Sequence, residues 1–159
     1  MSRAFVAFGS NLEAPEAQVK AAISTLAELP GLALVKASSL YRTAPVGYLD
    51  QPDFINAVAE FDSALSADEL LDTLHATEEK FGRVRTFRNA PRVLDLDLLW
   101  FEGVTQDSER LTLPHPRMHE RAFVMVPLAQ IAPELAIGAH GDAATLAASL
   151  AGQGIEKLG

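Results

Sequence analysis

The chain has 159 residues and no cysteine, and its formal net charge of −8 corresponds to a sequence pI of about 4.9. Its length suits one domain with a sizeable core, and 48% hydrophobic and 21% charged residues are ordinary for a globular protein. The missing cysteines exclude disulfides, cysteine-ligated metals and thiol catalysis. The acidic balance argues against bulk binding to nucleic acid, because phosphate contacts supply most of that affinity.

No repeat, low-complexity segment or linker divides the chain, so we expect a single domain over residues 1–159. The apolar start of the chain is too short for a signal peptide or a membrane span. We therefore expect a cytoplasmic protein that binds neither membranes nor nucleic acid.

Hydrophobic alternation and helical spacing predict a series of strands and helices. In chain order these are a strand over 4–8, a helix from near Pro15 to Pro30, a strand over 32–40, a loop over 41–52, a strand over 54–61, a helix from the capping box at Ser66 to Gly82, and a strand over 92–101. The predicted additions are an irregular hairpin over 104–113, helices over 121–131 and near 143–151, and a loose tail. This order is that of a ferredoxin-like β-α-β-β-α-β core. It predicts an α+β fold with a mostly antiparallel sheet, two helices on one face and C-terminal additions.

The most informative stretch is the predicted strand over residues 92–101, which contains Asp95 and Asp97. Side chains two apart on a strand share a face and lie about 6–7 Å from each other, so both carboxylates project together while the alternate leucines pack on the other face. Like charges this close repel, and one or two divalent cations would relieve the repulsion. An exposed strand face without metal is the alternative.

A local positive cluster precedes this strand in an otherwise acidic chain, formed by Arg83, Arg85, Arg88 and Arg92. Guanidinium groups bind phosphate oxygens in bidentate fashion. Carboxylates that could hold metal, beside arginines that could hold phosphate, indicate a magnesium–nucleotide site.

Three further positions combine polar or aromatic chemistry with a predicted element. Asn56 offers both a donor and an acceptor to the edge of a flat heterocycle, and Phe54 could stack on it; a solvent-facing amide beside an incidental Phe is the alternative. Glu78 falls on the apolar stripe of its helix, which indicates either a polar site or a carboxylate that reaches out to water.

Two histidines, His115 and His119, are four residues apart, a spacing that on a helix could bind metal. The prolines on both sides of His115 argue against such a helix, and no carboxylate ligand is obvious nearby. His115 fits better as a donor to phosphate. Phe123 fits either the core or a second aromatic wall of a ligand site.

At Asn89–Leu99 the sequence resembles the 6-hydroxymethyl-7,8-dihydropterin pyrophosphokinases of folate biosynthesis. Further matching segments occur in order along the chain: Gly9-Ser10-Asn11-Leu12, Tyr41–Pro45, Asp50–Asn56, Gly82–Arg85 and Leu113–His115. The resemblance implies a transferase that moves the terminal pyrophosphate of ATP to the pterin's hydroxymethyl group and releases AMP. It also implies ATP and the pterin as the binding partners of a monomer.

The resemblance also assigns roles to individual residues. It implies that Asp95 and Asp97 bind two Mg²⁺ and that, with Arg83 and Arg92, they form the catalytic group. The nucleotide contacts that it implies are Glu78, Arg83, Arg92, Leu98, Arg110, Thr112, His115 and Arg121. The pterin contacts that it implies are Thr43, Pro45, Val46, Gly47, Phe54, Asn56 and Phe123.

Two other functional classes stay open at this point. One is a ferredoxin-like module that binds a small ligand or RNA without catalysis. The other is a two-metal nucleotidyltransferase on a similar sheet, which would release pyrophosphate where the pyrophosphokinase releases AMP. The released product separates these possibilities.

Overall fold

The computed structural model of the chain describes residues 1–11, 14–44, 51–81 and 94–158. Its centre is a six-stranded sheet of order β5-β1-β4-β3-β8, in which β2 also pairs with β4. The strands are β1 (Ser2–Ser10), β2 (Leu32–Ala37), β3 (Leu40–Thr43), β4 (Phe54–Ser63), β5 (Asp95–Phe101) and β8 (Ile155–Leu158). Every pairing in this sheet is antiparallel. The order of β5, β1, β4 and β2 confirms the predicted ferredoxin-like core.

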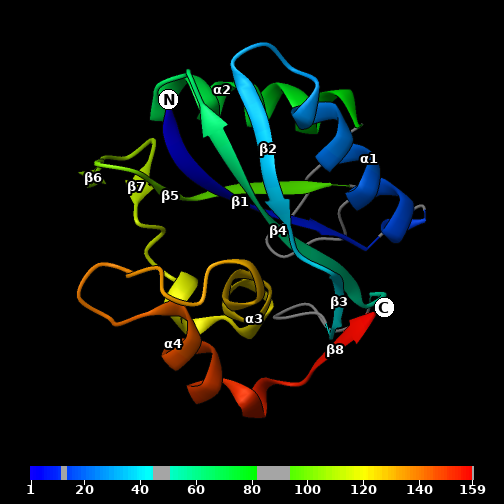
Figure 1. Cartoon of the computed structure of the whole chain (residues 1–159). Helices are drawn as coiled ribbons and strands as arrows, with labels where there is room; N and C mark the ends of the chain where they lie inside the picture. The colour runs from blue at the N-terminus through cyan, green and yellow to red at the C-terminus, as the bar shows by residue number, and fades with distance from the viewer. Residues whose placement is uncertain (12–13, 45–50, 82–93, 159) are drawn as a thin grey trace.

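Helices cover both faces of the sheet (Figure 1). On one face, α1 (Pro15–Ala27) and α2 (Ala67–Lys80) enclose a core that includes Val6, Phe61 and Leu74. On the other face, α3 (Ala122–Ile131) and α4 (Ala143–Ser149) pack over a second apolar cluster around Phe5 and Leu128. The sequence predicted all four helices and placed the two core helices on one face, but it assigned no face to the C-terminal helices. The C-terminal additions cover part of the second face because α3 is apolar on most sides.

A local sequence signal sets the start of α2. Ser66 and Glu69 form the predicted capping box at the start of α2, with the Glu69 N–H donating to the Ser66 hydroxyl at 3.2 Å and the Ser66 N–H donating to the Glu69 carboxylate at 2.9 Å. The predicted hairpin is present as the short strands β6 (Gln106–Asp107) and β7 (Thr112–Leu113). None of the described helices is long and apolar enough to cross a bilayer.

The predicted single strand over 32–40 is two strands, because Ser38 interrupts it. The Ser38 N–H donates to the Val58 carbonyl at 2.9 Å, and the Ser38 hydroxyl accepts from the Val58 N–H at 2.9 Å. The Ser38 hydroxyl thus takes the place of one backbone acceptor. Strand β2 pairs with β4 before Ser38, and β3 pairs with β4 after it. The prediction that a loop begins at Tyr41 was wrong, since β3 extends to Thr43.

The C-terminal tail is also ordered, contrary to the predicted loose end. After a 3-10 turn at Ala151–Gln153, β8 pairs with β3 over four residue pairs, from Leu40↔Leu158 to Thr43↔Ile155. Strand β3 would otherwise present unpaired backbone groups at the edge of the sheet, and β8 satisfies them.

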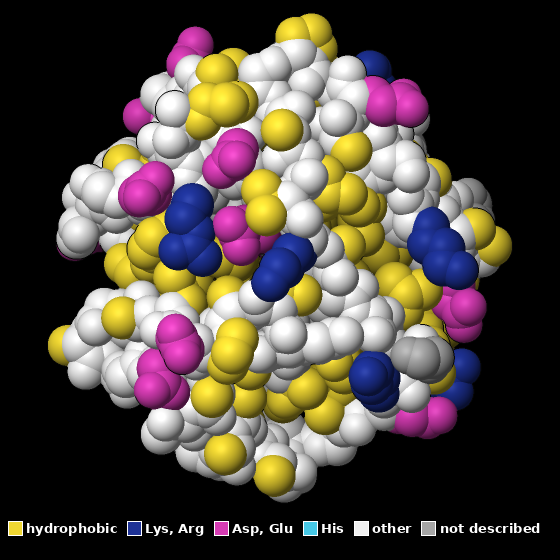
Figure 2. All heavy atoms as spheres, viewed as in Figure 1, with side chains coloured by type: hydrophobic (Ala, Val, Ile, Leu, Met, Phe, Trp, Pro, Cys, Tyr) yellow, Lys and Arg dark blue, Asp and Glu magenta, His cyan; other side chains and the backbone are white. Residues whose placement is uncertain are grey.

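On the face shown in Figure 2, basic and acidic side chains are interspersed over the molecular surface.

Candidate active site

Strand register aligns residues of β5, β1 and β4 in two rows across the sheet, with the polar side chains on β5 and β4 and small residues of β1 between them. Gly9 of β1 lies between Asp95 of β5 and Asn56 of β4. One step along, Ala7 lies between Asp97 and Val58. Residues 7 and 9 share a face, as do 95 and 97, so the small residues of β1 leave room between the carboxylates and the amide.

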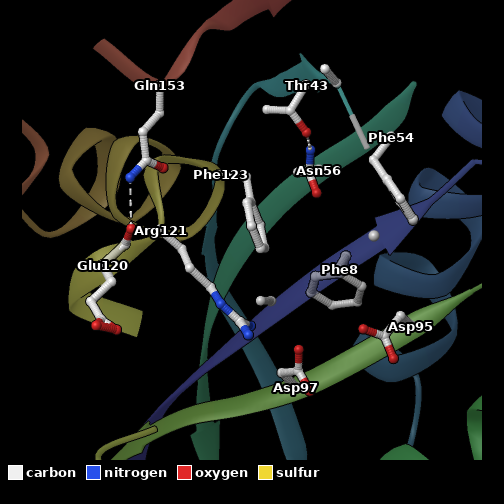
Figure 3. Close-up of a pocket in the computed structure, with 13 residues that line it drawn as sticks. Phe8, Thr43, Phe54, Asn56, Asp95, Asp97, Glu120, Arg121, Phe123 and Gln153 are labelled. Carbon is white, nitrogen blue, oxygen red and sulfur yellow. Dashed lines mark hydrogen bonds between the residues drawn. The ribbon is translucent and has the colours of Figure 1, made fainter. Parts of the chain in front are cut away.

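A cavity of about 440 Å³ lies over this part of the sheet. Figure 3 shows that its walls come from strands β1, β3, β4 and β5, from the start of α3 and from the C-terminal segment. The lining residues are Ala7, Phe8, Gly9, Thr43, Ala44, Phe54, Asn56, Asp95, Asp97, Glu120, Arg121, Phe123 and Gln153.

One end of the cavity carries two aromatic side chains and an amide. Phe54 and Phe123 lie on either side of Asn56 (Figure 3). The Asn56 side chain is 5% exposed and its Nδ2 donates to the Thr43 hydroxyl at 2.8 Å, which directs Oδ1 toward the cavity. A Cβ added to Gly9 would stand 3.5 Å from this oxygen, so glycine leaves the approach to Asn56 open. This end can sandwich a flat ring and accept a hydrogen bond from its edge.

The other end carries charge. Asp95 and Asp97 both line the cavity and are half-buried, while the guanidinium of Arg121 extends toward them from the start of α3 (Figure 3). The leucines between and beside the two carboxylates are buried in the opposite core. The predicted projection of both aspartates from one face is therefore confirmed.

The donor set at this end fits magnesium better than zinc. Among the residues that the structure describes, no three His, Cys, Asp or Glu side chains gather around one point. Mg²⁺ is commonly held by one or two carboxylates, with the remaining positions taken by water and substrate phosphates. Asp95 and Asp97 supply this number of carboxylates.

His115 lies beside the charged end as a neutral imidazole. Burial, the positive charge of Arg121 and that of Arg117 lower the pKa of His115 from 6.5 to about 4, although the negative charge of Asp95 raises it. The backbone N–H of Arg117 donates to Nδ1 of His115 at 3.2 Å. The proton of the neutral ring is therefore on Nε2, where it can be donated to an anion.

Because the folded protein keeps His115 neutral, the free energy of unfolding is expected to fall on acidification. Between pH 6.5 and about 4, the unfolded chain binds a proton at His115 that the folded chain does not, so stability is lost as pH falls through this window. We expect His115→Gln to reduce the loss between pH 7.5 and pH 5 by about 1.5 kcal/mol, after allowance for partial exposure. Urea unfolding of the wild-type chain and of His115→Gln at both pH values measures this loss of unfolding free energy. Equal losses in both proteins would contradict the depressed pKa.

Two residues predicted to contact nucleotide have side chains directed elsewhere. Glu78 is 1% exposed, and its carboxylate accepts a hydrogen bond at 2.8 Å from the N–H of Leu96, which lies between the two aspartates of β5. Glu78 therefore neither reaches water nor lines the cavity, and instead supports the strand that carries Asp95 and Asp97. The side chain of Leu98 packs in the core shared with α1 and α2, on the face of β5 opposite the cavity.

Arg110 and Thr112 belong to the β6–β7 hairpin and lie outside the cavity lining. The guanidinium of Arg110 pairs with Asp68 at 3.3 Å and with Asp72, both on α2. These pairs are exposed, so they contribute little to stability. A nucleotide contact by Arg110 would require the guanidinium to exchange these carboxylates for phosphate.

The remaining predicted residues, Arg83, Arg92, Pro45, Val46 and Gly47, lie outside the described residues. Thr43, Phe54, Asn56, Asp95, Asp97, Arg121 and Phe123 are the predicted residues that the fold brings together around one cavity. Sequence reasoning missed Gln153 and the small floor residues Ala7 and Gly9. Gly9, a glycine within the first strand, was a usable signal for the floor, whereas nothing in the local pattern singled out Gln153.

Comparisons of this chain with known proteins all match one family over most of its length. The family model described as 7,8-dihydro-6-hydroxymethylpterin-pyrophosphokinase (HPPK) matches residues 5–133. The 2-amino-4-hydroxy-6-hydroxymethyldihydropteridine pyrophosphokinase of Pseudomonas aeruginosa is 44% identical over 158 residues, which cover 99% of this chain and 98% of that protein. The protein of the same name from Haemophilus influenzae is 45% identical over 137 residues, 86% of each chain.

Solved structures with the same fold include Plasmodium falciparum HPPK-DHPS. One of these structures matches with a TM-score of 0.70 at 13% identity and covers 94% of this chain. Another has a TM-score of 0.72 at 12% identity. The matches span 43% and 45% of those longer chains, and at this identity they support the fold alone. The family match and the curated relatives establish that the chain belongs to the 7,8-dihydro-6-hydroxymethylpterin-pyrophosphokinase family.

Proposed function

We propose that the chain transfers pyrophosphate from ATP to the hydroxymethyl group of 6-hydroxymethyl-7,8-dihydropterin, releasing AMP, and that the cavity over β1 is where it does so. The observation that carries the assignment is the division of one cavity into an aromatic end with an edge-binding amide and a charged end with two carboxylates and an arginine. Its volume of about 440 Å³ lies within the range of small-molecule sites.

At the aromatic end, we place the pterin ring between Phe54 and Phe123. Ring stacking of this kind suits a flat heterocycle, and the Asn56 Oδ1 accepts a hydrogen bond from the N–H groups at its edge. Thr43 holds the Asn56 amide in the required orientation through the 2.8 Å hydrogen bond. The same assignment includes Pro45, Val46 and Gly47, which stay predictions outside the described residues.

At the charged end, we place the triphosphate of ATP, with Asp95 and Asp97 holding two Mg²⁺. Bound there, the ions supply charge neutralisation for the phosphates and a lower pKa for the attacking hydroxyl. Arg121 and the Nε2–H of neutral His115 face the phosphates as donors. Arg83 and Arg92 remain predicted phosphate contacts, and Arg110 and Thr112 remain predicted nucleotide contacts. Glu78 and Leu98 were also predicted on the nucleotide side, Leu98 beside the adenine, but their side chains point into the core.

The reaction that this arrangement serves is a displacement at phosphorus. The pterin hydroxyl loses its proton and forms a bond from its oxygen to the β-phosphorus of ATP. The bond from that phosphorus to the oxygen that bridges it to the α-phosphorus breaks, and AMP leaves with the bridging oxygen. Such transfers depend on positioning and charge stabilisation more than on covalent chemistry by the protein.

We further propose that the chain works in the cytoplasm as a monomer on these two ligands, without nucleic acid. The net charge of −8 and the mixed surface charge of Figure 2 support the last point.

The test is a product assay with ATP, Mg²⁺ and the reduced hydroxymethylpterin. We expect AMP and pterin diphosphate in equal amounts, and neither product without pterin or without Mg²⁺. Release of pyrophosphate would indicate nucleotidyl transfer instead. Pterin binding without turnover would indicate a binding module.

A further inference from the structure

The C-terminal segment, residues 151–158, reaches the lining of the cavity (Figure 3). This segment lies beyond residues 5–133, the part of the chain that the family model matches. Gln153 is its one residue in the cavity lining. The side chain reaches from the C-terminal segment to the start of α3, where Arg121 and Phe123 enter the cavity (Figure 3).

The amide of Gln153 binds the peptide groups on both sides of Arg121. Its Oε1 accepts from the Ala122 N–H at 2.9 Å, and its Nε2 donates to the Glu120 carbonyl at 2.8 Å. Arg121 stands at the N-cap of α3 but its side chain makes no capping hydrogen bond. Gln153 therefore satisfies a helix N–H that has no partner within the helix, a role that N-cap side chains usually perform.

These two hydrogen bonds hold the peptide groups that flank Arg121, and the Arg121 N–H also donates to the Met118 carbonyl at 3.2 Å, so the direction in which the side chain leaves the backbone is restricted. With the flanking peptides held, the Arg121 side chain extends over the Phe123 ring, with its guanidinium carbon 5.5 Å from the ring centroid, and on toward the carboxylates of β5. Phe123 lies two residues further along the same first turn. The hydrogen bonds of Gln153 thus hold the segment that carries both a group at the charged end and a ring at the aromatic end.

Strand β8 anchors Gln153 from the other side. Ile155, two residues after Gln153, pairs with Thr43 of β3, and Thr43 is the residue that orients Asn56. The C-terminal segment therefore joins the start of α3 to the strand that holds the edge-binding amide.

We propose that Gln153 is a positioning residue for the reaction, acting through Arg121 and Phe123. The inference rests on the ligand placement given under Proposed function. It makes the C-terminal segment a part of the active site.

The decisive variant is Gln153→Met, which keeps the length of the side chain and removes both hydrogen bonds. Gln130→Met is the matched control. Gln130 lies near the other end of α3, where its Oε1 accepts from the Ser39 N–H at 2.9 Å and from the Tyr41 hydroxyl at 2.7 Å. Each variant removes hydrogen bonds that tie α3 to another segment, but Gln130 is outside the cavity lining.

We expect both variants to lower the Tm by similar amounts. In Gln153→Met, the pterin Kd, measured by pterin fluorescence without nucleotide, and the KM for ATP should each rise about tenfold, because small displacements of binding groups cost this much or more. In Gln130→Met, both constants should stay within about twofold of the parent. A purely structural role would lower the fraction of folded enzyme and the apparent kcat, and would leave the Kd and KM unchanged.

Constants in Gln153→Met that match those of Gln130→Met would overturn the proposal. If Gln153→Met does not fold, Gln153→Asn takes its place, since its amide is one methylene too short to span both peptide groups. We then expect both constants to rise at least about threefold, and unchanged constants would overturn the proposal equally. Failure of the wild-type chain to form AMP in the product assay would instead reject the proposed reaction, while the pterin Kd values would still test the role of Gln153.

Discussion

Replacing Asp97 by alanine is expected to lower kcat at least about a thousandfold, which corresponds to about 4 kcal/mol of lost transition-state stabilisation. The reason is that Asp97 is one of two carboxylates at the charged end of the cavity, and phosphoryl transfer depends mainly on charge neutralisation and positioning there. The pterin Kd without nucleotide should stay within about threefold, because the ring-binding residues lie at the other end. Single-turnover formation of AMP and pterin fluorescence titration measure the two quantities.

The matched control is Asp107→Ala, which removes an exposed aspartate from the short strand β6. It lowers the net negative charge by the same amount and should leave kcat unchanged. Both variants should keep the far-UV circular dichroism spectrum of the parent. Near-parental turnover in Asp97→Ala would reject the metal assignment of this carboxylate.

Asn56→Ala is expected to raise the pterin Kd about a hundredfold while changing the KM for ATP by less than about threefold. The variant removes the acceptor that faces the ring edge and leaves the Thr43 hydroxyl without its 2.8 Å partner. Sites built around a buried hydrogen bond lose affinity steeply when one side of it is removed. Fluorescence titration of the pterin measures this effect directly.

Thr43→Val separates the loss of the Asn56 acceptor from the loss of the hydrogen bond that orients it. Valine keeps the volume of threonine but cannot hold the Asn56 amide, so we expect a smaller rise in pterin Kd, about tenfold. Asp62→Ala, on the same strand as Asn56 but at its far end, is the control and should bind pterin as the parent does. A pterin Kd in Asn56→Ala equal to that of Asp62→Ala would remove the edge-binding role from Asn56.

Local sequence was sufficient for the ferredoxin-like core and for the shared face of Asp95 and Asp97. Strand alternation has a period of two, so the direction of each side chain follows from its position in the strand. The capping box at Ser66 likewise specified the start of α2 through contacts between neighbours. The resemblance to a known family then assigned ligand contacts to Asn56, Phe54 and Phe123. For these residues, strand and helix patterns alone also allowed a solvent-facing or core position.

Tertiary structure decided where several polar side chains find their partners. Arg110 pairs with Asp68 and Asp72 on a helix far from it in sequence, although the family resemblance implied a contact with nucleotide. Glu78 binds the Leu96 N–H at the edge of β5, although its place on the helical stripe left water or a ligand open. In both cases the partner depends on which segments the fold brings side by side.

Gln153 shows the physical reason most clearly. Its two partners are backbone groups of Glu120 and Ala122, more than 30 residues away along the chain. Every residue except proline offers the same N–H and every residue the same carbonyl, so a hydrogen bond to the backbone has no signature in the amino-acid sequence of its partner. Sequence alone therefore determined the core and the face that carries the carboxylates. Only the folded chain placed the C-terminal segment against the start of α3, because that placement depends on the pairing of β8 with β3.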